Sequence, residues 1–139
     1  MTATNFITSA QRTIKMEADA VAELQHRLDD SFVTACETML ACEGRVIVTG
    51  MGKSGHIGNK IAATLASTGT PSFFVHPGEA SHGDLGMITK NDVVIVISNS
   101  GSTAEVITIL PLIKRLGIPM ISMTGDPGSV LSQAARANL

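Results

Sequence analysis

The chain has few aromatic residues and few charges, and each scarcity excludes a class of partner. Its 139 residues include no Trp, no Tyr and four Phe, so aromatic residues make up 3% of the sequence. Surfaces that stack nucleic-acid bases, and belts at a membrane interface, are built from such side chains. Charged residues make up 16%, and the formal net charge is −2. The sequence therefore predicts no nucleic-acid partner and no attraction to an anionic membrane surface.

Long apolar segments are absent as well. The longest, such as residues 93–97, are far shorter than the roughly 20 residues of a membrane-spanning helix. The N-terminus, Met-Thr-Ala-Thr-Asn, lacks the charged and then apolar layout of a signal peptide. Cys36 and Cys42 lie six residues apart in a region of helical pattern, and about 100° per residue puts them on opposed faces. We expect two unpaired thiols, no membrane contact and a cytoplasmic location.

Apolar residues make up 44% of the sequence, which fits one folded domain in a chain of this length. Residues 1–43 have the spacing of helices, with apolar side chains every three or four positions. The first helix carries Ile7, Ala10, Ile14, Ala18, Val21, Leu24 and Leu28. Asp29-Asp30-Ser31 offers N-caps for a second helix, which is expected to stop at Gly44.

Residues 44–139 alternate between short β-branched segments and helical segments. Strands are expected at 45–49, 72–75, 93–97 and 118–123, and helices at 57–68, 102–116 and 129–138. Such alternation indicates an α/β fold with a parallel sheet and right-handed crossovers. Pro111 lies inside the helix expected at 102–116, where we expect a bend. No fifth strand is expected after the fourth, which suggests that the chain is a fragment of a longer protein.

Ligands of open parallel sheets bind beyond the carboxyl ends of the strands, where this sequence places its Gly- and Ser-rich loops. The first loop has the pattern G-x-G-x-x-G at Gly50, Gly52 and Gly55. A dinucleotide site also needs an acidic residue at the end of the second strand, and none stands there. The P-loop pattern of NTPases is absent too. Lys53 and Ser54 supply phosphate-binding chemistry, and the alternative is a tight turn that needs glycine and binds nothing.

The third loop is richer in hydroxyl groups and leads into the expected helix at 102–116. Its hydroxyl residues are Ser98, Ser100, Ser102 and Thr103, and Gly101 allows close approach of the backbone. Free N–H groups at a helix N-terminus bind anions, and hydroxyl groups can complete a phosphate shell. The alternative is ordinary N-capping, which needs one hydroxyl group. We interpret this loop as a phosphate site.

Several motifs resemble those of a known family. Ser98-Asn-Ser-Gly-Ser-Thr-Ala-Glu105 resembles the S-x-S-G-x-T-x-E signature of the sugar isomerase (SIS) fold. Gly50-Met-Gly-Lys-Ser-Gly-His56, residues 62–79 and His82-Gly-Asp-Leu-Gly86 are similar to the arabinose 5-phosphate isomerases of lipopolysaccharide and capsule biosynthesis. The resemblance implies a three-layer α/β/α SIS domain with a flavodoxin-like parallel sheet at 44–139, preceded by helices at 1–43 that belong to the same domain.

The resemblance also implies a reaction and a site. The reaction interconverts D-ribulose 5-phosphate and D-arabinose 5-phosphate, whose product feeds synthesis of the acid sugar Kdo. The implied catalytic residues are Lys53, Glu105 and His82, and the implied substrate- and phosphate-binding residues are Gly52, Ser54, Gly55, Ser98, Asn99, Ser100 and Thr103. No cofactor and no metal are implied, and the expected partners are a sugar phosphate and other copies of the chain, in a tetramer. Glu105 could be the base or hold a sugar hydroxyl group, or it could only complement a helix dipole.

The family pattern continues beyond this sequence. A further Glu, a further His and paired CBS domains of the family are missing, so the SIS domain is expected to be truncated at its C-terminal end. Two other functions remain open: a non-catalytic sugar-phosphate sensor, and an isomerase for another ketose phosphate. His56 and His82 could be hydrogen-bonded structural histidines, and His76, which precedes Pro77, could only close a turn.

Overall fold

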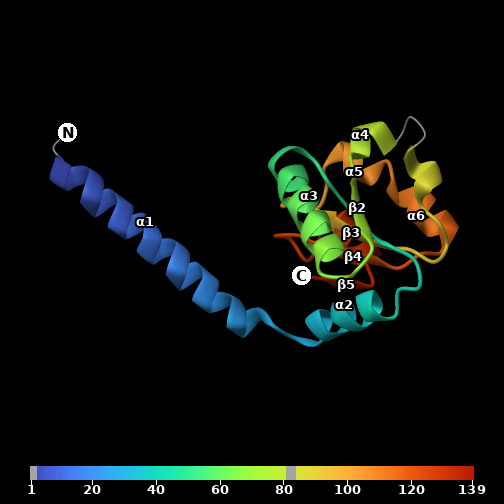
Figure 1. Cartoon of the computed structure of the whole chain (residues 1–139), viewed down its shortest axis with the longest axis horizontal. Helices are drawn as coiled ribbons and strands as arrows, with labels where there is room; N and C mark the ends of the chain where they lie inside the picture. The colour runs from blue at the N-terminus through green and yellow to red at the C-terminus, as the bar shows by residue number, and fades with distance from the viewer. Residues whose placement is uncertain (1–2, 81–83) are drawn as a thin grey trace. The chain divides into compact units, whose positions relative to one another are not determined.

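A computed structural model describes residues 3–80 and 84–139, which form two compact units, residues 1–30 and 31–139 (Figure 1). In the described part of the chain, no helix combines the length and apolar character needed to cross a bilayer. The first unit is helix α1 (Ala3–Glu23) with the 3-10 turn η1 (Leu24–Arg27). Its large apolar side chains are more than half exposed: Phe6, Ile7, Ile14, Met16, Val21, Leu24 and Leu28. Phe6, Ile7, Ile14 and Val21 lie along one side of α1, so the helix has an apolar stripe that its own unit leaves uncovered.

The second unit contains a five-stranded parallel sheet in the order β2-β1-β3-β4-β5. The strands are β1 (Val46–Gly50), β2 (Ser72–Val75), β3 (Val93–Ile97), β4 (Met120–Met123) and β5 (Ala137–Asn138). This order is that of flavodoxin-like folds, so the fold class is confirmed. The expectation that no fifth strand follows is wrong. The helix expected at 129–138 ends early, and Ala137 pairs with Ile121 of β4.

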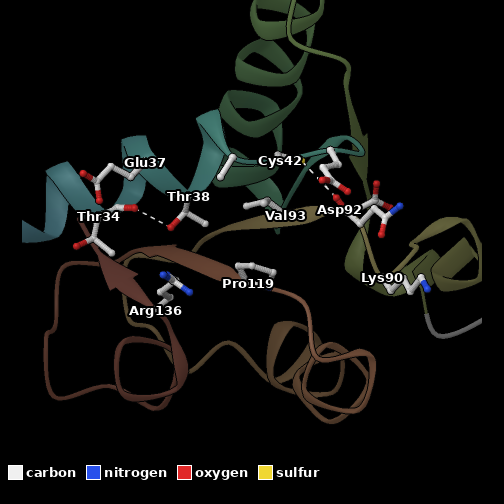
Figure 2. A pocket seen from close by; sticks show the side chains of 12 residues that line it. Thr34, Glu37, Thr38, Cys42, Lys90, Asp92, Val93, Pro119 and Arg136 are labelled. Atoms are coloured by element: carbon white, nitrogen blue, oxygen red, sulfur yellow. Dashed lines mark hydrogen bonds between the residues drawn. The ribbon is translucent and has the colours of Figure 1, made fainter.

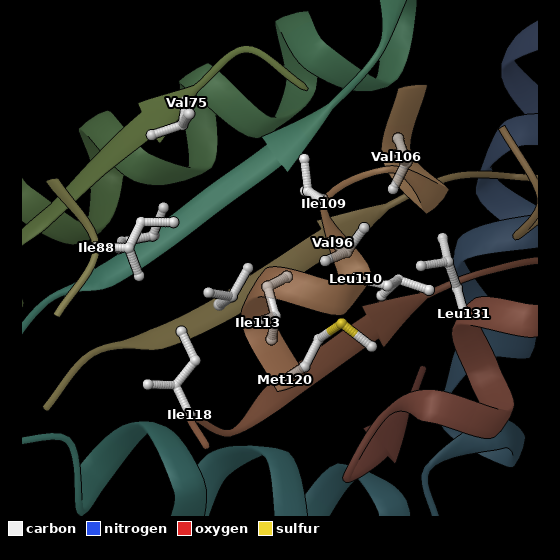
Figure 3. Packing of buried hydrophobic residues seen from close by; sticks show 12 residues of the cluster. Val75, Ile88, Val96, Val106, Ile109, Leu110, Ile113, Ile118, Met120 and Leu131 are labelled. Atoms are coloured by element: carbon white, nitrogen blue, oxygen red, sulfur yellow. The ribbon is translucent and has the colours of Figure 1, made fainter. Parts of the chain in front are cut away.

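Helices cover both faces of this sheet, which gives the three layers that were expected. Side chains of β1 alternate between the faces. Val46 and Val48 pack in the cluster that contains Ala35 and Ala62, from α2 (Asp30–Leu40) and α3 (Gly52–Ser67). Ile47 packs in the opposite cluster, with residues of α5 (Ala104–Ile107), α6 (Leu110–Leu116) and α7 (Val130–Ala134) (Figure 3). The sheet is thus buried on both faces, as its continuous apolar strands predict.

The helix boundaries differ from the expected ones where glycine and proline intervene. Helix α3 begins at Gly52, five residues before the expected start, so the glycine-rich loop is itself the first helical turn. The helix expected at 102–116 is divided into α5 and α6. Pro111 lies in the first turn of α6, where a missing N–H group costs nothing. The expected bend is confirmed as a complete break.

The remaining connection runs from β2 to β3 through α4 (Pro77–Ala80) and the 3-10 turn η2 (Asp84–Met87). Cys36 and Cys42 are both free thiols, as expected. Cys42 lies just beyond the end of α2, where its thiol donates to the backbone oxygen of Asn91 at 3.5 Å.

A buried carboxylate secures the amino ends of β1 and β3. Asp92 is 1% exposed and accepts hydrogen bonds from the N–H groups of Arg45 at 2.8 Å and Thr89 at 2.7 Å. The Arg45 guanidinium lies 3.6 Å from the same carboxylate and donates to the backbone oxygen of Met87. Burial alone raises the pKa of Asp92, but the hydrogen bonds from Thr89 and Arg45 outweigh it, and the pKa is lowered.

At the other end of β1, Thr49 is buried in an apolar setting. It is 2% exposed, and the register places it between Val75 and Val96. Its hydroxyl is the one buried side-chain oxygen or nitrogen, within residues 3–80 and 84–139, that has no hydrogen-bond partner. A hydroxyl group in this position loses its hydration without replacement, which destabilises the fold.

We predict that Asp92→Asn lowers the free energy of unfolding at pH 7 by about 1–3 kcal/mol, because an amide cannot replace a carboxylate that accepts two N–H groups. A lowered folded-state pKa stabilises the fold above the ordinary value of 3.8, and this contribution is lost as pH falls through the folded-state pKa. The difference between wild type and variant should therefore shrink in acid. Urea unfolding at pH 7 and at pH 3 measures it, and an equal difference at both would contradict this account.

We predict that Thr49→Val raises the free energy of unfolding by up to about 1 kcal/mol, because valine has the same shape and leaves no unpaired hydroxyl group. Thr38→Val is the matched control, since the Thr38 hydroxyl is also buried but donates to the backbone oxygen of Thr34 at 2.7 Å. The control should show no gain. Thermal unfolding of both variants compares them, and a Thr49→Val protein less stable than wild type would show that its hydroxyl has a partner.

Candidate functional site

The strand register aligns the loops that were expected to carry the site. Gly50 of β1 pairs with Ile97 of β3, and Ile97 pairs with Met123 of β4. In β2, Val75 pairs with Thr49. All four strands therefore end at the same edge of the sheet, and each is followed at once by one of the polar loops. This edge, the carboxyl edge, is where parallel α/β sheets bind ligands.

The glycines of the first loop bring α3 against the end of β1. A Cβ on Gly55 would lie 2.6 Å from the backbone oxygen of Gly50, and one on Gly50 would lie 2.9 Å from that of Ile97. Gly52 has φ +54°, a conformation that favours glycine. Packing and backbone geometry thus account for the glycines, as they would if this loop were only a tight turn that binds no ligand. They do not account for Lys53 and Ser54.

Lys53 and Ser54 lie in the first turn of α3. The first hydrogen bond of this turn runs from the N–H of Gly55 to the oxygen of Met51, at 3.2 Å. The N–H groups of Gly52, Lys53 and Ser54 precede it and belong to the donors that a helix leaves without an internal acceptor. Lys53 is exposed. Backbone donors, a hydroxyl group and a cation therefore converge at the carboxyl edge, a combination that binds anions.

The third loop uses its hydroxyl groups differently from an ordinary N-cap. Thr103 is the N-cap residue of α5, yet its side chain makes no capping bond. Its hydroxyl instead shares a 2.8 Å hydrogen bond with that of Ser98, which is 3% exposed. Ser100 is exposed, and its oxygen accepts from the N–H of Ser102 at 3.3 Å. The capping alternative therefore does not explain the loop.

Gly101 has a different neighbour from the one expected. The loop was expected to need glycine so that a ligand could approach its backbone. Gly101 has φ +60°, and a Cβ there would collide with the side chain of Ser129. Glycine is thus required at position 101 by its backbone conformation and by close contact with the segment that follows β4. The sequence places this loop, residues 124–128, after the fourth strand at the expected ligand edge, but it gives no sign of the contact with Gly101.

The structure places two of the three expected catalytic residues at the carboxyl edge. Lys53 lies in the first turn of α3 and Glu105 in the first turn of α5, both exposed. These helices follow β1 and β3, which are neighbours in the sheet. His82 lies outside the described residues. A cation and a carboxylate thus come from adjacent strand ends.

The other histidines have more local settings. His76 Nδ1 accepts a hydrogen bond from the N–H of Gly78 at 3.2 Å, which supports the interpretation that it closes a turn. His56 is exposed on α3. Both line a small pocket of about 180 Å³, together with Gly52, Gly55, Asn59 and Phe74. Among the residues that the structure describes, no three His, Cys, Asp or Glu side chains gather as a metal site.

A larger hollow, of about 390 Å³, lies at the opposite edge of the sheet (Figure 2). Val93, Pro119 and Arg136 line it, and each stands at or just before the start of a strand. Thr34 and Thr38 of α2 close it from one side, and their side chains face toward Arg136. Because it lies at the amino ends of the strands, this hollow is remote from the polar loops of the carboxyl edge.

Known proteins share both the sequence and the fold. The SIS domain profile matches residues 39–139. The arabinose 5-phosphate isomerase KdsD of Pseudomonas aeruginosa is 71% identical over 135 residues, which are 97% of this chain and 41% of that protein. KdsD of Escherichia coli K12 is 53% identical over the same shares. The chain thus spans about two fifths of the length of these relatives.

One solved structure extends the likeness to three dimensions. The c3406 protein of Escherichia coli CFT073, in complex with arabinose 5-phosphate, is 45% identical and superposes with a TM-score of 0.94. The match covers 99% of this chain and 73% of that one. The profile match covers most of the chain and the fold agrees with that of the solved relative, so the chain belongs to the SIS domain family.

Proposed function

We propose that the carboxyl edge binds the phosphate group of a pentose phosphate. The observation that carries the proposal is that two loops rich in hydrogen-bond donors follow neighbouring strand ends. One contributes the first turn of α3 with Lys53 and Ser54, and the other contributes Ser98, Ser100 and Thr103. The solved relative holds arabinose 5-phosphate, which supports the same ligand class here.

We further propose that the protein interconverts D-ribulose 5-phosphate and D-arabinose 5-phosphate. A base removes a proton from the carbon beside the carbonyl group, and an enediolate forms. The proton then returns to the neighbouring carbon, so no atom is gained or lost and no redox cofactor or metal is needed. Lys53 is suited to stabilise the negative charge of the enediolate. Glu105 is suited to move the proton or to hold a sugar hydroxyl group, and we propose that His82 completes the set.

The names of the curated relatives support a role in supplying arabinose 5-phosphate. We propose that this product feeds Kdo synthesis for lipopolysaccharide or capsule, in the cytoplasm. The chain spans 41% of those relatives, so the activity belongs in this proposal to the longer protein. Binding of sugar phosphate without turnover by that protein would favour a sensor function instead.

We also propose that copies of this chain associate through α1. Ile7, Ile14 and Val21 of α1 recur every seven residues, and each is more than half exposed. An apolar stripe with this repeat is the pattern of helices that pack against one another. A second copy supplies the same stripe, and we propose a tetramer as the complete assembly.

We predict that arabinose 5-phosphate binds to the purified chain. Lys53→Met and Ser100→Ala should each raise the dissociation constant about tenfold, because each variant loses one hydrogen bond to a charged group, worth roughly 1.4 kcal/mol. Lys60→Met and Ser67→Ala are matched controls on α3, exposed and away from the carboxyl edge. Isothermal titration calorimetry measures the dissociation constants. Equal losses in the control variants, or equally tight binding of unphosphorylated arabinose, would contradict the phosphate site.

We predict that the chain is larger in solution than its 14.5 kDa mass. Ile14→Glu should reduce the assembly, because it places a charge in the apolar stripe. Ser9→Glu introduces the same charge on the opposite face of the same helix, where Ser9 is exposed, and as the control it should leave the assembly intact. Light scattering after size-exclusion chromatography gives the masses. A monomeric wild type would refute association through α1.

A further inference from the structure

The expected phosphate loop, residues 98–103, is held from behind by residues 124–131, here called the buttress segment. The N–H of Gly125 donates to the oxygen of Asn99 at 3.0 Å, and the N–H of Leu131 donates to the oxygen of Gly101 at 3.1 Å. These two bonds bracket Ser100. The N–H of Ser98 also donates to the oxygen of Met123, the last residue of β4, at 3.1 Å.

Side-chain contacts make the fit between the two segments close. A Cβ on Gly101 would collide with Ser129, which is 6% exposed. A Cβ on Gly125 would lie 3.0 Å from Asn99 Oδ1 and 3.1 Å from its backbone oxygen. Gly125 is not among the glycines with positive φ, so its conformation does not itself demand glycine. The lack of space beside Asn99 is what disfavours a larger residue than glycine at position 125.

The buttress segment is itself anchored to the edge of the sheet. The Thr124 hydroxyl donates to Asn138 Oδ1 at 2.8 Å and lies 2.9 Å from the Ser132 hydroxyl. Ser122 of β4 donates to the same Asn138 oxygen at 2.8 Å. A polar network thus connects β4, β5 and α7 behind the phosphate loop. Groups held in this way resist displacement, because several bonds must break together.

We infer that the buttress segment sets the shape of the phosphate loop in advance of ligand binding, and that Gly125 is a positioning residue for Asn99, Ser100 and Gly101. Ordering the backbone of a loop costs conformational entropy, and a loop that is already ordered does not incur this cost on binding. Gly125 touches no ligand in this account. The inference rests on the proposed phosphate site, which it extends to a residue outside the loops that carry it.

The test compares Gly125→Ala with Gly128→Ala. Both add one methyl group within the buttress segment, but a Cβ on Gly128 meets only Asp126 Oδ1, at 3.2 Å, and so spares the phosphate loop. Hydrogen exchange without ligand is measured at the amides of residues 98–103. Calorimetry then measures binding of arabinose 5-phosphate, and thermal unfolding reports global stability.

In Gly125→Ala the loop amides should exchange about tenfold faster and the dissociation constant should rise about 3- to 10-fold, a change of roughly 0.7–1.4 kcal/mol. The control should match wild type in both, with similar midpoints of thermal unfolding for the two variants. Unchanged exchange in Gly125→Ala would overturn the inference, and so would faster exchange with unchanged binding. If wild type binds no sugar phosphate, the proposed function fails, and the exchange measurement alone decides whether the buttress segment shapes the loop.

Discussion

The close packing of α3 on the end of β1 is the constraint on which the site depends. Gly55 rests against the backbone oxygen of Gly50, and Gly50 in turn faces the oxygen of Ile97 at the end of β3. A side chain larger than hydrogen at either glycine would separate the first helical turn from the sheet. Because these contacts are backbone to backbone, they place the donors of the first turn beside the third loop. The convergence of the two loops thus follows from packing in the centre of the sheet.

The amino edge of the sheet contributes to the stability of the fold, and the carboxyl edge carries the groups suited to bind a ligand. At the amino edge, Asp92 satisfies buried N–H groups and fixes the start of β3 next to that of β1. At the carboxyl edge, polar groups are left open: Lys53, Ser100 and Glu105 are exposed. Free donors and unpaired charges add little to folding stability but are what an anionic ligand requires. The buttress segment is the exception, since its hydrogen bonds hold the shape of a neighbouring loop.

Some elements could be predicted because a local pattern determines them. The strands at 72–75 and 93–97 were predicted with their observed bounds, since short segments rich in aromatic or β-branched residues between turn residues favour strands. The break at Pro111 follows from its missing N–H group. The start of α3 was wrong by five residues, because glycine disfavours helix and only contact with β1 stabilises a helix that begins at Gly52. The strand β5 was missed because two residues carry no periodicity.

By itself the sequence determined the class of fold, the polar loops and the chemistry that they hold, since strand patterns, hydroxyl groups and a lysine are local properties. The resemblance in its motifs was sufficient to identify the SIS domain family, which the comparisons confirmed. Only the tertiary structure decided which neighbours those residues meet. Gly101 was interpreted as room for a ligand, and it contacts Ser129 from a segment nearly 30 residues away. Such contacts depend on strand order and register, and no local pattern in the chain encodes the distance between two loops.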